Sequence, residues 1–308
     1  MKRTNCVVAQ VLLWSLFVSR VATVAQDAES GPLLLRASVP KASIKKAEPL
    51  PVLVEVENQS QATVPIVSLF EPVYGFLRFH IVQPDGDEFE YQPISTVSLA
   101  NLNKTDLSAG DVITHTELLL YSANDGYVFS QTGVYSVVVS FDVYGNGHPL
   151  NAKSLSVLVE DPEGIDNEAY SLFYGTDQGR FAAGNSDSVI AKKNFSEIST
   201  KYANSRYAGY CEFYLGLYYL EKHSYPEAET MLQRILLEHP DFPLVADVGY
   251  RLAKYYVQTG QNNKAIESLA GVIATYPKDV IAQKAKILLT TITPSALGGA
   301  TGASISGP

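Results

Sequence analysis

Side chains that commonly carry catalysis or bind metals are few in this 308-residue sequence, and none has a catalytic spacing. The sequence contains no His-Glu-x-x-His helix, no Gly-x-Ser-x-Gly turn and no phosphate-binding loop. The five histidines are scattered, without the short spacings of zinc ligands on one helix. We therefore expect no enzyme activity, no catalytic residues, no metal site and no cofactor.

Two smaller features favour structural roles. Asp85-Gly86-Asp87-Glu88 offers three carboxylates but lacks the spacing of an EF-hand, and with Pro84 before it the segment is typical of a hairpin turn. Cys211 lies in an apolar helical pattern, where cysteine usually acts as a small packing residue. The other cysteine, Cys6, lies in an apolar N-terminal segment that we expect to be removed, so no disulfide can form within the remaining chain.

Small and apolar residues recur at an interval of 37 residues in the C-terminal half. When Ala191, Ala228 and Ala265 are aligned, apolar residues follow four and seven positions later in each copy: Phe195, Leu232, Leu269, Ile198, Ile235 and Val272. These spacings describe one face of a helix, which Pro240 and Pro277 then end. A period of this size predicts stacked helical hairpins.

These positions resemble the tetratricopeptide repeat, a pair of antiparallel helices. Two copies match well, through Leu215-Gly216, Tyr219, Ala228, Leu232, Ile235 and Pro240, and through Leu252-Ala253, Tyr256, Ala265, Leu269, Val272 and Pro277. An earlier copy keeps its second helix, but Gln178-Gly179 and Ala182 replace the Leu-Gly pair and the tyrosine of its first helix. The long period and the ending Tyr276-Pro277 resemble repeats of bacterial cell-envelope proteins, such as outer-membrane assembly lipoproteins and the accessory protein of the Tol-Pal system.

The resemblance implies a concave groove lined by the first helix of each hairpin. It assigns nine groove residues: Phe173, Thr176 and Arg180 from the earlier copy, Tyr210, Phe213 and Leu217 from the second, and Tyr250, Lys254 and Val257 from the third. Aromatic and aliphatic groups with two cations suit an amphipathic peptide or an extended chain with an acidic group. The alternative for each aromatic residue is packing inside the repeats.

Residues 33–161 carry a different pattern, in which short β-rich runs are separated by turn residues. The predicted strands are 33–39, 51–57, 63–70, 76–82, 88–91, 112–121, 134–143 and 155–160, and they indicate an antiparallel β-sandwich. We interpret the polar segment 95–111 as a surface loop. Segments 48–58 and 129–139 resemble strands of bacterial immunoglobulin-like extracellular domains, which bind proteins or glycans or serve as spacers.

Residues 1–25 have the pattern of a secretory signal peptide. Lys2 and Arg3 precede the apolar run 6–19, and small residues at 22–25 offer a cleavage site. No lipobox surrounds Cys6, and an uncleaved anchor is the alternative because Arg20 lies close to the cleavage site. Removing the three leader cations changes the formal charge from −9 to −12, which argues against nucleic-acid binding.

The sequence thus predicts a multidomain β plus α protein. It has a signal peptide at 1–25, an immunoglobulin-like antiparallel sandwich at 26–161, a tetratricopeptide-like α-helical solenoid at 165–292 and a disordered tail at 293–308. Because end repeats expose an apolar face, we expect helix 279–292 to cap one end of the solenoid and the sandwich to pack on the other through 165–173.

For function, the sequence favours a non-enzymatic exported scaffold, periplasmic or extracellular, without a membrane span after cleavage. It would bind a protein or peptide partner in the cell envelope through the groove. One alternative is a glycan-binding or protease-inhibiting sandwich with the repeats as its platform. Another is an accessory subunit of an envelope enzyme. The oligomeric state is left open.

Overall fold

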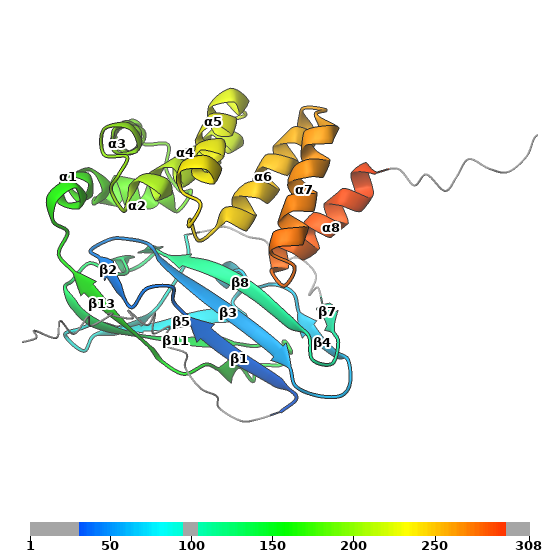
Figure 1. Cartoon of the computed structure of the whole chain (residues 1–308). Coiled ribbons are helices and arrows are strands. Elements are labelled where there is room, and N and C mark those ends of the chain that lie inside the picture. The colour runs from blue at the N-terminus through cyan, green and yellow to red at the C-terminus, as the bar shows by residue number, and fades with distance from the viewer. Residues whose placement is uncertain (1–30, 95–103, 294–308) are drawn as a thin grey trace, which may run out of the picture.

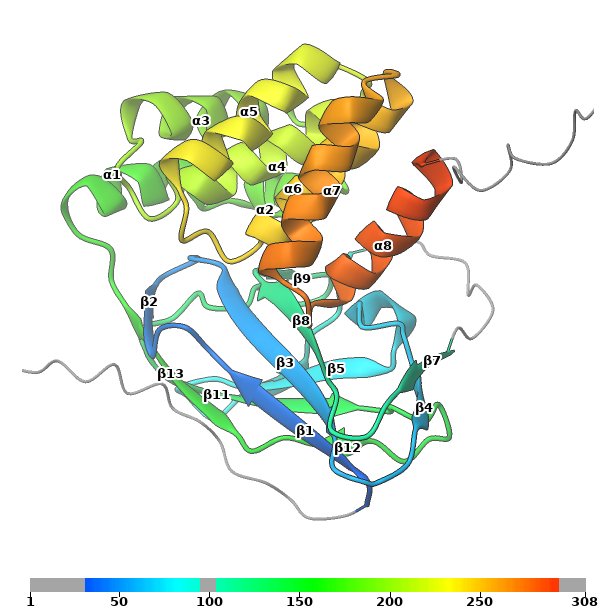
Figure 2. The ribbon, with the colours of Figure 1, turned by 45° about the vertical axis from the view of Figure 1, so that its right-hand side comes forward.

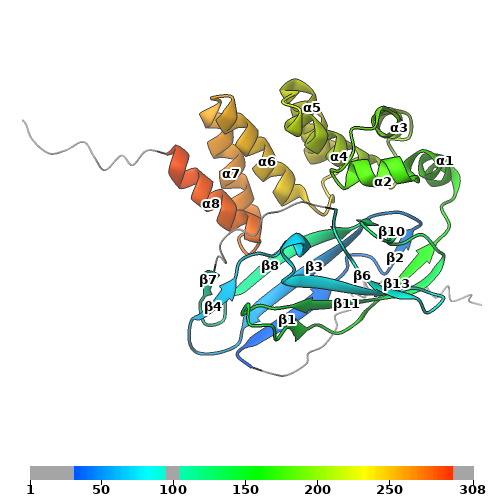
Figure 3. The ribbon, with the colours of Figure 1, turned by 180° about the vertical axis from the view of Figure 1, so that it is seen from behind.

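A computed structural model describes residues 31–94 and 104–293. They form a β part followed along the chain by a helical part, which confirms the predicted β plus α organisation. The helices lie as a layer over one side of the sheets, as the opposite views in Figures 1 and 3 show. The predicted signal peptide lies outside the described residues, as does the predicted tail beyond Thr293. Within 31–94 and 104–293, no helix is both long and apolar enough to cross a bilayer.

The strands of the β part are short and follow each other closely. They are β1 (Leu33–Ser38), β2 (Ser43–Lys45), β3 (Leu50–Asn58), β4 (Val64–Val67), β5 (Leu77–Val82), β6 (Glu88–Glu90), β7 (Lys104–Leu107), β8 (Val112–Leu119), β9 (Tyr121–Ser122), β10 (Gly126–Tyr127), β11 (Gly133–Phe141), β12 (Leu150–Asn151) and β13 (Leu155–Glu160). One sheet has the order β1-β3-β8, and a second has β2-β13-β11-β5-β6 with β12 beside β11. Pairing is antiparallel except between β13 and β2.

Every predicted strand overlaps an observed one, because the alternating residues do share a buried face. Val52, Val54 and Val56 of β3 are fully buried, and with Leu77 and Phe79 of β5 they belong to one core between the two large sheets. The interpretation of 95–111 as a loop is wrong over β7, which pairs with β4; residues 95–103 lie outside the described residues.

The helical part contains eight α-helices within the described residues. They are α1 (Gly164–Phe173), α2 (Thr176–Ala182), α3 (Val189–Lys201), α4 (Ala208–Glu221), α5 (Tyr225–Glu238), α6 (Val245–Gln258), α7 (Asn262–Thr275) and α8 (Val280–Ile292). A short 3-10 turn, η1 (Pro72–Tyr74), lies in the β part. Helices α4 with α5 and α6 with α7 form the two well-matched hairpins.

The repeat residues act in packing as their sizes indicate. A Cβ on Gly216 would lie 2.6 Å from Leu232 Cδ2, so the absent side chain is what allows α4 and α5 to approach. Asp279 caps α8 by accepting a hydrogen bond from the backbone N–H of Ile281 at 2.7 Å. Ser224 precedes α5, but its side chain makes no cap hydrogen bond.

The first repeat differs from the others because its first helix is divided into α1 and α2. Gly179 of α2 faces the β part: a Cβ at this position would lie 2.0 Å from the Tyr121 ring of β9. The Leu-Gly pair of a repeat serves contact between its own helices, whereas Gly179 serves contact with the sandwich. The second helix of the first repeat, α3, keeps the expected buried face of Ala191, Phe195 and Ile198.

The sandwich contacts the helical array at both of its ends. At the first end, the Tyr127 hydroxyl donates to the carbonyl oxygen of Phe173 at 2.7 Å, and Arg206 pairs with the buried Glu48 at 2.8 Å. At the last end, the Thr114 N–H donates to the carbonyl oxygen of Lys278 at 2.8 Å. Figure 2 shows α8 beside this end of the sheets. The α8 helix therefore covers the last hairpin and also binds the sandwich, which the sequence did not predict.

Candidate functional site

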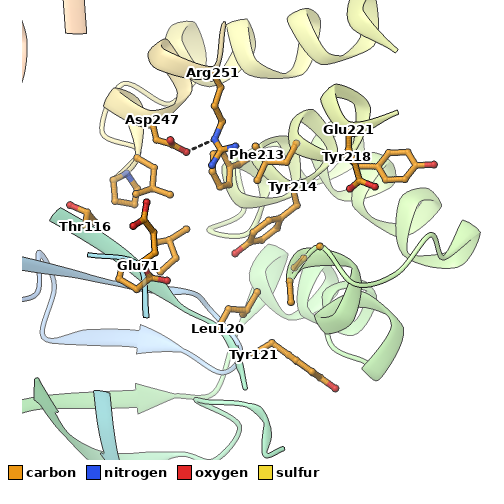
Figure 4. A pocket seen from close by; sticks show the side chains of 18 of the residues that line it. Glu71, Thr116, Leu120, Tyr121, Phe213, Tyr214, Tyr218, Glu221, Asp247 and Arg251 are labelled. Atoms are coloured by element: carbon orange, nitrogen blue, oxygen red, sulfur yellow. Dashed lines mark hydrogen bonds and ion pairs between the residues drawn. The ribbon is translucent and has the colours of Figure 1, made fainter. Parts of the chain in front are cut away.

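A cleft of about 860 Å³ lies between the helical array and the sandwich, in the span between the two end contacts. Helices α4 and α6 form one wall, and β8 with Glu71, the residue before η1, forms the other. Figure 4 shows Phe213 and Tyr214 on the helical side, facing Thr116 and Glu71 on the sandwich side. Clefts of about 300–1,000 Å³ are the usual size for ligand sites.

Four of the nine predicted groove residues line this cleft. Phe213 and Leu217 come from α4, one turn apart, and Tyr250 and Lys254 come from α6 with the same spacing. Residues four apart lie on one side of a helix, so each pair presents one stripe to the cleft. Lys254 is exposed and makes no ion pair with any described residue, and Phe213 is nearly buried against Phe242 and Tyr214.

The structure places the other five elsewhere. Phe173 is fully buried, and its ring stacks on that of Phe195 with centroids 5.2 Å apart. Thr176 and Arg180 are exposed on α2, Val257 is half-buried against the helical core, and none of the three lines the cleft. Tyr210 lines a second cavity, of about 420 Å³, on the other side of the residues that connect α5 to α6.

The sandwich wall is the half of the cleft that sequence reasoning missed. Four consecutive residues of β8, from His115 to Leu118, line the cavity. Because successive side chains of a strand point to opposite faces, a cavity that meets all four lies along the edge of the strand. The apolar alternation of 112–121 indicated the strand, but no local signal indicated that helices of the same chain would cover its edge.

Ion pairs rim the cleft near its last end. Lys284 of α8 bonds Glu71 at 2.6 Å, and Arg251 pairs with Asp247 one turn earlier on α6. Burial is the largest single influence on the pKa of Glu71 and raises it, but the hydrogen bond from Lys284, the charge of Lys284 and smaller contributions together outweigh it. This pKa therefore lies below its ordinary value. Burial raises the pKa of Asp279. Most charges of this rim are thus already paired within the protein.

A second charged group lies at the opposite end of the cleft. Asp187 accepts hydrogen bonds from Lys192 and from the Tyr218 hydroxyl, each at 2.7 Å. These two bonds lower the pKa of Asp187 to about 2. The ammonium of Lys192 also lies 4.6 Å from the centroid of the Tyr218 ring. Across all lining residues, six carboxylates face four Lys and Arg side chains.

A buried acidic cluster lies within the hairpin of α4 and α5, the first of the two well-matched repeats, and was also missed. Glu212 of α4 is fully buried, and its carboxylate lies within 4.8 Å of ligand atoms of Glu238 and His239, which is close enough to hold a metal ion. Arg234 already supplies a positive charge there, at 2.8 Å from Glu212 and 3.2 Å from Glu238. Burial raises the pKa of Glu212 to about 7. Cys211 is buried next to it, and burial raises the pKa of its thiol.

Comparison with known proteins supports the repeat assignment. A family model described as tetratricopeptide repeat matches residues 219–287, which run from the end of α4 into α8. No curated protein matches the chain.

Solved structures resemble only part of the chain. A mutant β-glucosidase from Listeria innocua in complex with laminaribiose aligns at 17% identity over 42% of this chain, with a TM-score of 0.26, and the match covers only 16% of that enzyme. The CARDB domain of a Pyrococcus furiosus protein in complex with di-metal ions aligns at 14% identity, with a TM-score of 0.26, over 42% of this chain and 87% of that domain.

The sporulation control protein Spo0M from Bacillus subtilis aligns at 12% identity, with a TM-score of 0.27, over 46% of this chain and 54% of that protein. Scores this low carry no functional argument. The comparisons therefore establish one feature that bears on function: the C-terminal helices of this chain match the tetratricopeptide repeat, an arrangement that suggests a protein-interaction scaffold.

Proposed function

We propose that this protein is a non-enzymatic scaffold that holds a short segment of a protein partner in the cleft between its repeats and its sandwich. The observation that carries the proposal is the shared wall: Phe213, Leu217 and Tyr250 present apolar surface from two repeat helices to one cavity. Aromatic side chains with a few convergent polar groups are typical of such recognition sites. The proposal extends to an exported protein of the cell envelope, supported by the signal-like residues 1–25 and the repeat subtype.

The cleft favours one segment of chain over a broad docking surface. Its sandwich wall lies opposite the groove helices, so a folded domain cannot lie across the concave face of α4 and α6 without displacing β8. The sequence-based expectation of an acidic ligand rested on Arg180 and Lys254. Because Arg180 does not line the cleft and carboxylates outnumber cations there, the structure favours a segment with net positive charge.

A pair of surface variants tests the site. Leu217→Glu places a charge on the apolar wall, and we expect it to abolish binding of peptides recovered from an arrayed peptide library. Leu217 is a better target than Phe213, because Phe213 packs in the helical core and its removal would disturb the fold. Leu237→Glu on α5 is the matched control, since Leu237 is 80% exposed and does not line the cleft.

The expected result is loss of peptide binding with Leu217→Glu alone, while both variants keep the circular dichroism and melting temperature of the parent. If the two variants bind the peptide equally well, the cleft is not the partner site. The exposed surface of the sandwich would then be the next region to probe.

A further inference from the structure

Strand β8 is an edge strand whose outer side is turned toward the cleft. It lies last in the sheet order β1-β3-β8, so only its inner side is paired, with β3. The Thr114 N–H donates outward, to Lys278 in the segment before α8. Alternate residues of a strand share one side, so the backbone groups of Thr116 and Leu118 point outward as well. Leu118 lies opposite Pro51, which has no N–H to offer it.

The free part of this edge is short and has a defined beginning and end. Hydrogen bonds within the chain limit the free part at both ends. The Thr114 N–H is already bonded to Lys278, and the Leu120 carbonyl oxygen accepts from the Val128 N–H at 2.9 Å. Between these limits, no backbone partner within residues 31–94 and 104–293 bonds the outward groups of Thr116 and Leu118. From Thr114 to Leu120 a strand spans about 20 Å.

This free edge coincides with the cleft. Residues from His115 to Leu118 all line it, and the apolar side chains of Phe213 and Leu217 lie on the wall opposite. Unpaired N–H and C=O groups along a strand edge can bond another strand, and an extended peptide supplies both donors and acceptors in the correct spacing. The helices meanwhile prevent a second broad sheet from stacking against the edge.

We propose that the partner segment binds as an added β-strand on the outer edge of β8, with alternate side chains contacting Phe213 and Leu217. This inference rests on the proposed function and specifies how the segment binds. The occupant is an extended segment that alternates apolar and polar residues, carries net positive charge and has no proline at the positions that face Thr116 and Leu118. Backbone bonds would provide affinity, and the helical wall would select the side chains.

The first test alters the edge without altering the wall. Thr116→Pro removes one outward N–H and adds a ring on the open side, and proline is tolerated on the unpaired side of an edge strand. Thr116→Val is the matched control, because it keeps the N–H. The probe is a fluorescein-labelled peptide chosen from an array of alternating apolar and polar sequences with a lysine at one end. We expect about tenfold weaker binding for Thr116→Pro and little change for Thr116→Val.

A second test leaves the protein unchanged. Methylating alternate amide nitrogens of the peptide should abolish binding in one register and have little effect in the register shifted by one residue, because only alternate amides of a strand face its neighbour. In the parent protein, amide exchange followed by NMR should slow at Thr116 and Leu118 when the peptide binds. His115, whose amide faces β3, should not change.

Three results would overturn the inference. If methylation in both registers and Thr116→Pro leave affinity intact while Leu217→Glu abolishes it, the peptide lies in the cleft without strand pairing, and the proposed function survives alone. If Leu217→Glu has no effect either, both fail. If the Thr116 amide is already protected in the free protein, the edge has another occupant; a second copy would be identified by self-association that Thr116→Pro removes.

Discussion

Replacing Glu212 with glutamine should remove the part of the pH dependence of the free energy of unfolding that comes from this carboxyl group. Glu212 is fully buried in α4, beside Arg234, Glu238 and His239. Burial raises the pKa of its carboxyl group to about 7, from an ordinary value of 4.5, and the attraction of Arg234 offsets only part of that rise.

The sign follows from proton binding. Between the ordinary pKa of Glu212 and its raised value, the native protein holds a proton on this group that the unfolded chain has released. The free energy of unfolding therefore falls as pH rises through this window, and levels off above about pH 7. At about 1.4 kcal/mol for each unit of pKa, the loss amounts to about 3 kcal/mol.

The assay is urea unfolding of the parent and Glu212→Gln at several values between about pH 5 and pH 8. Burial lowers the pKa of His239, which changes stability in the opposite sense, but His239 is present in both proteins. The difference between the two curves therefore isolates Glu212. We expect the free energy of unfolding of the Glu212→Gln variant, relative to that of the parent, to rise by about 3 kcal/mol across this pH range. A difference independent of pH, or one that favours the parent as pH rises, would refute the reasoning.

Three further predictions concern packing and the contact between the two parts. Arg206→Ala should lower the free energy of unfolding by about 3 kcal/mol, because it leaves the carboxylate of Glu48 buried without its ion pair. Thermal melts would detect this loss, and an unchanged melting temperature would mean that Glu48 is solvated or protonated. Gly179→Ala should lower the free energy of unfolding by about 1–3 kcal/mol, because the new Cβ would overlap the Tyr121 ring. Adding Tyr121→Ala should relieve this loss in the double variant, and purely additive effects of the two substitutions would place the clash elsewhere. Cys211 should resist iodoacetamide in the native protein and react after unfolding, since its thiol is fully buried with a raised pKa, and rapid native labelling would contradict this placement.

Local pattern determined which elements could be predicted. The apolar faces of α3, α5 and α7 repeat the same small and branched residues, so Ala191, Ala228 and Ala265 located three helices and their packing. Alternation located the strands of both large sheets except the short β2 and β12, because each located strand has one buried face. The short strand β7 was missed since Lys104–Leu107 has little apolar alternation, and its pairing with β4 comes from tertiary structure.

The candidate site was predictable only where the repeats are regular. The residues assigned from α4 and α6 line the cleft, except Tyr210, which lines the second cavity, and Val257, which packs against the helical core. Those assigned from the first copy did not, because its first helix is divided at Tyr174 and Gly175. The wall formed by β8 depends on bonds between residues far apart in the chain, such as Lys284 with Glu71, and no local window contains both partners.

That separation also has a consequence for the order of assembly during synthesis. Lys284 and Glu71 are 213 residues apart, and the backbone bond from Thr114 to Lys278 likewise waits for the last helix. Contacts at such distance form slowly, and a nascent chain has both partners only when translation is nearly complete. The sandwich can fold while the repeats are still being made, but its β8 edge stays uncovered until α6 and α8 are in place. A chain that stops before Asp279 would therefore display an open strand edge, and we expect such truncated products to aggregate through it.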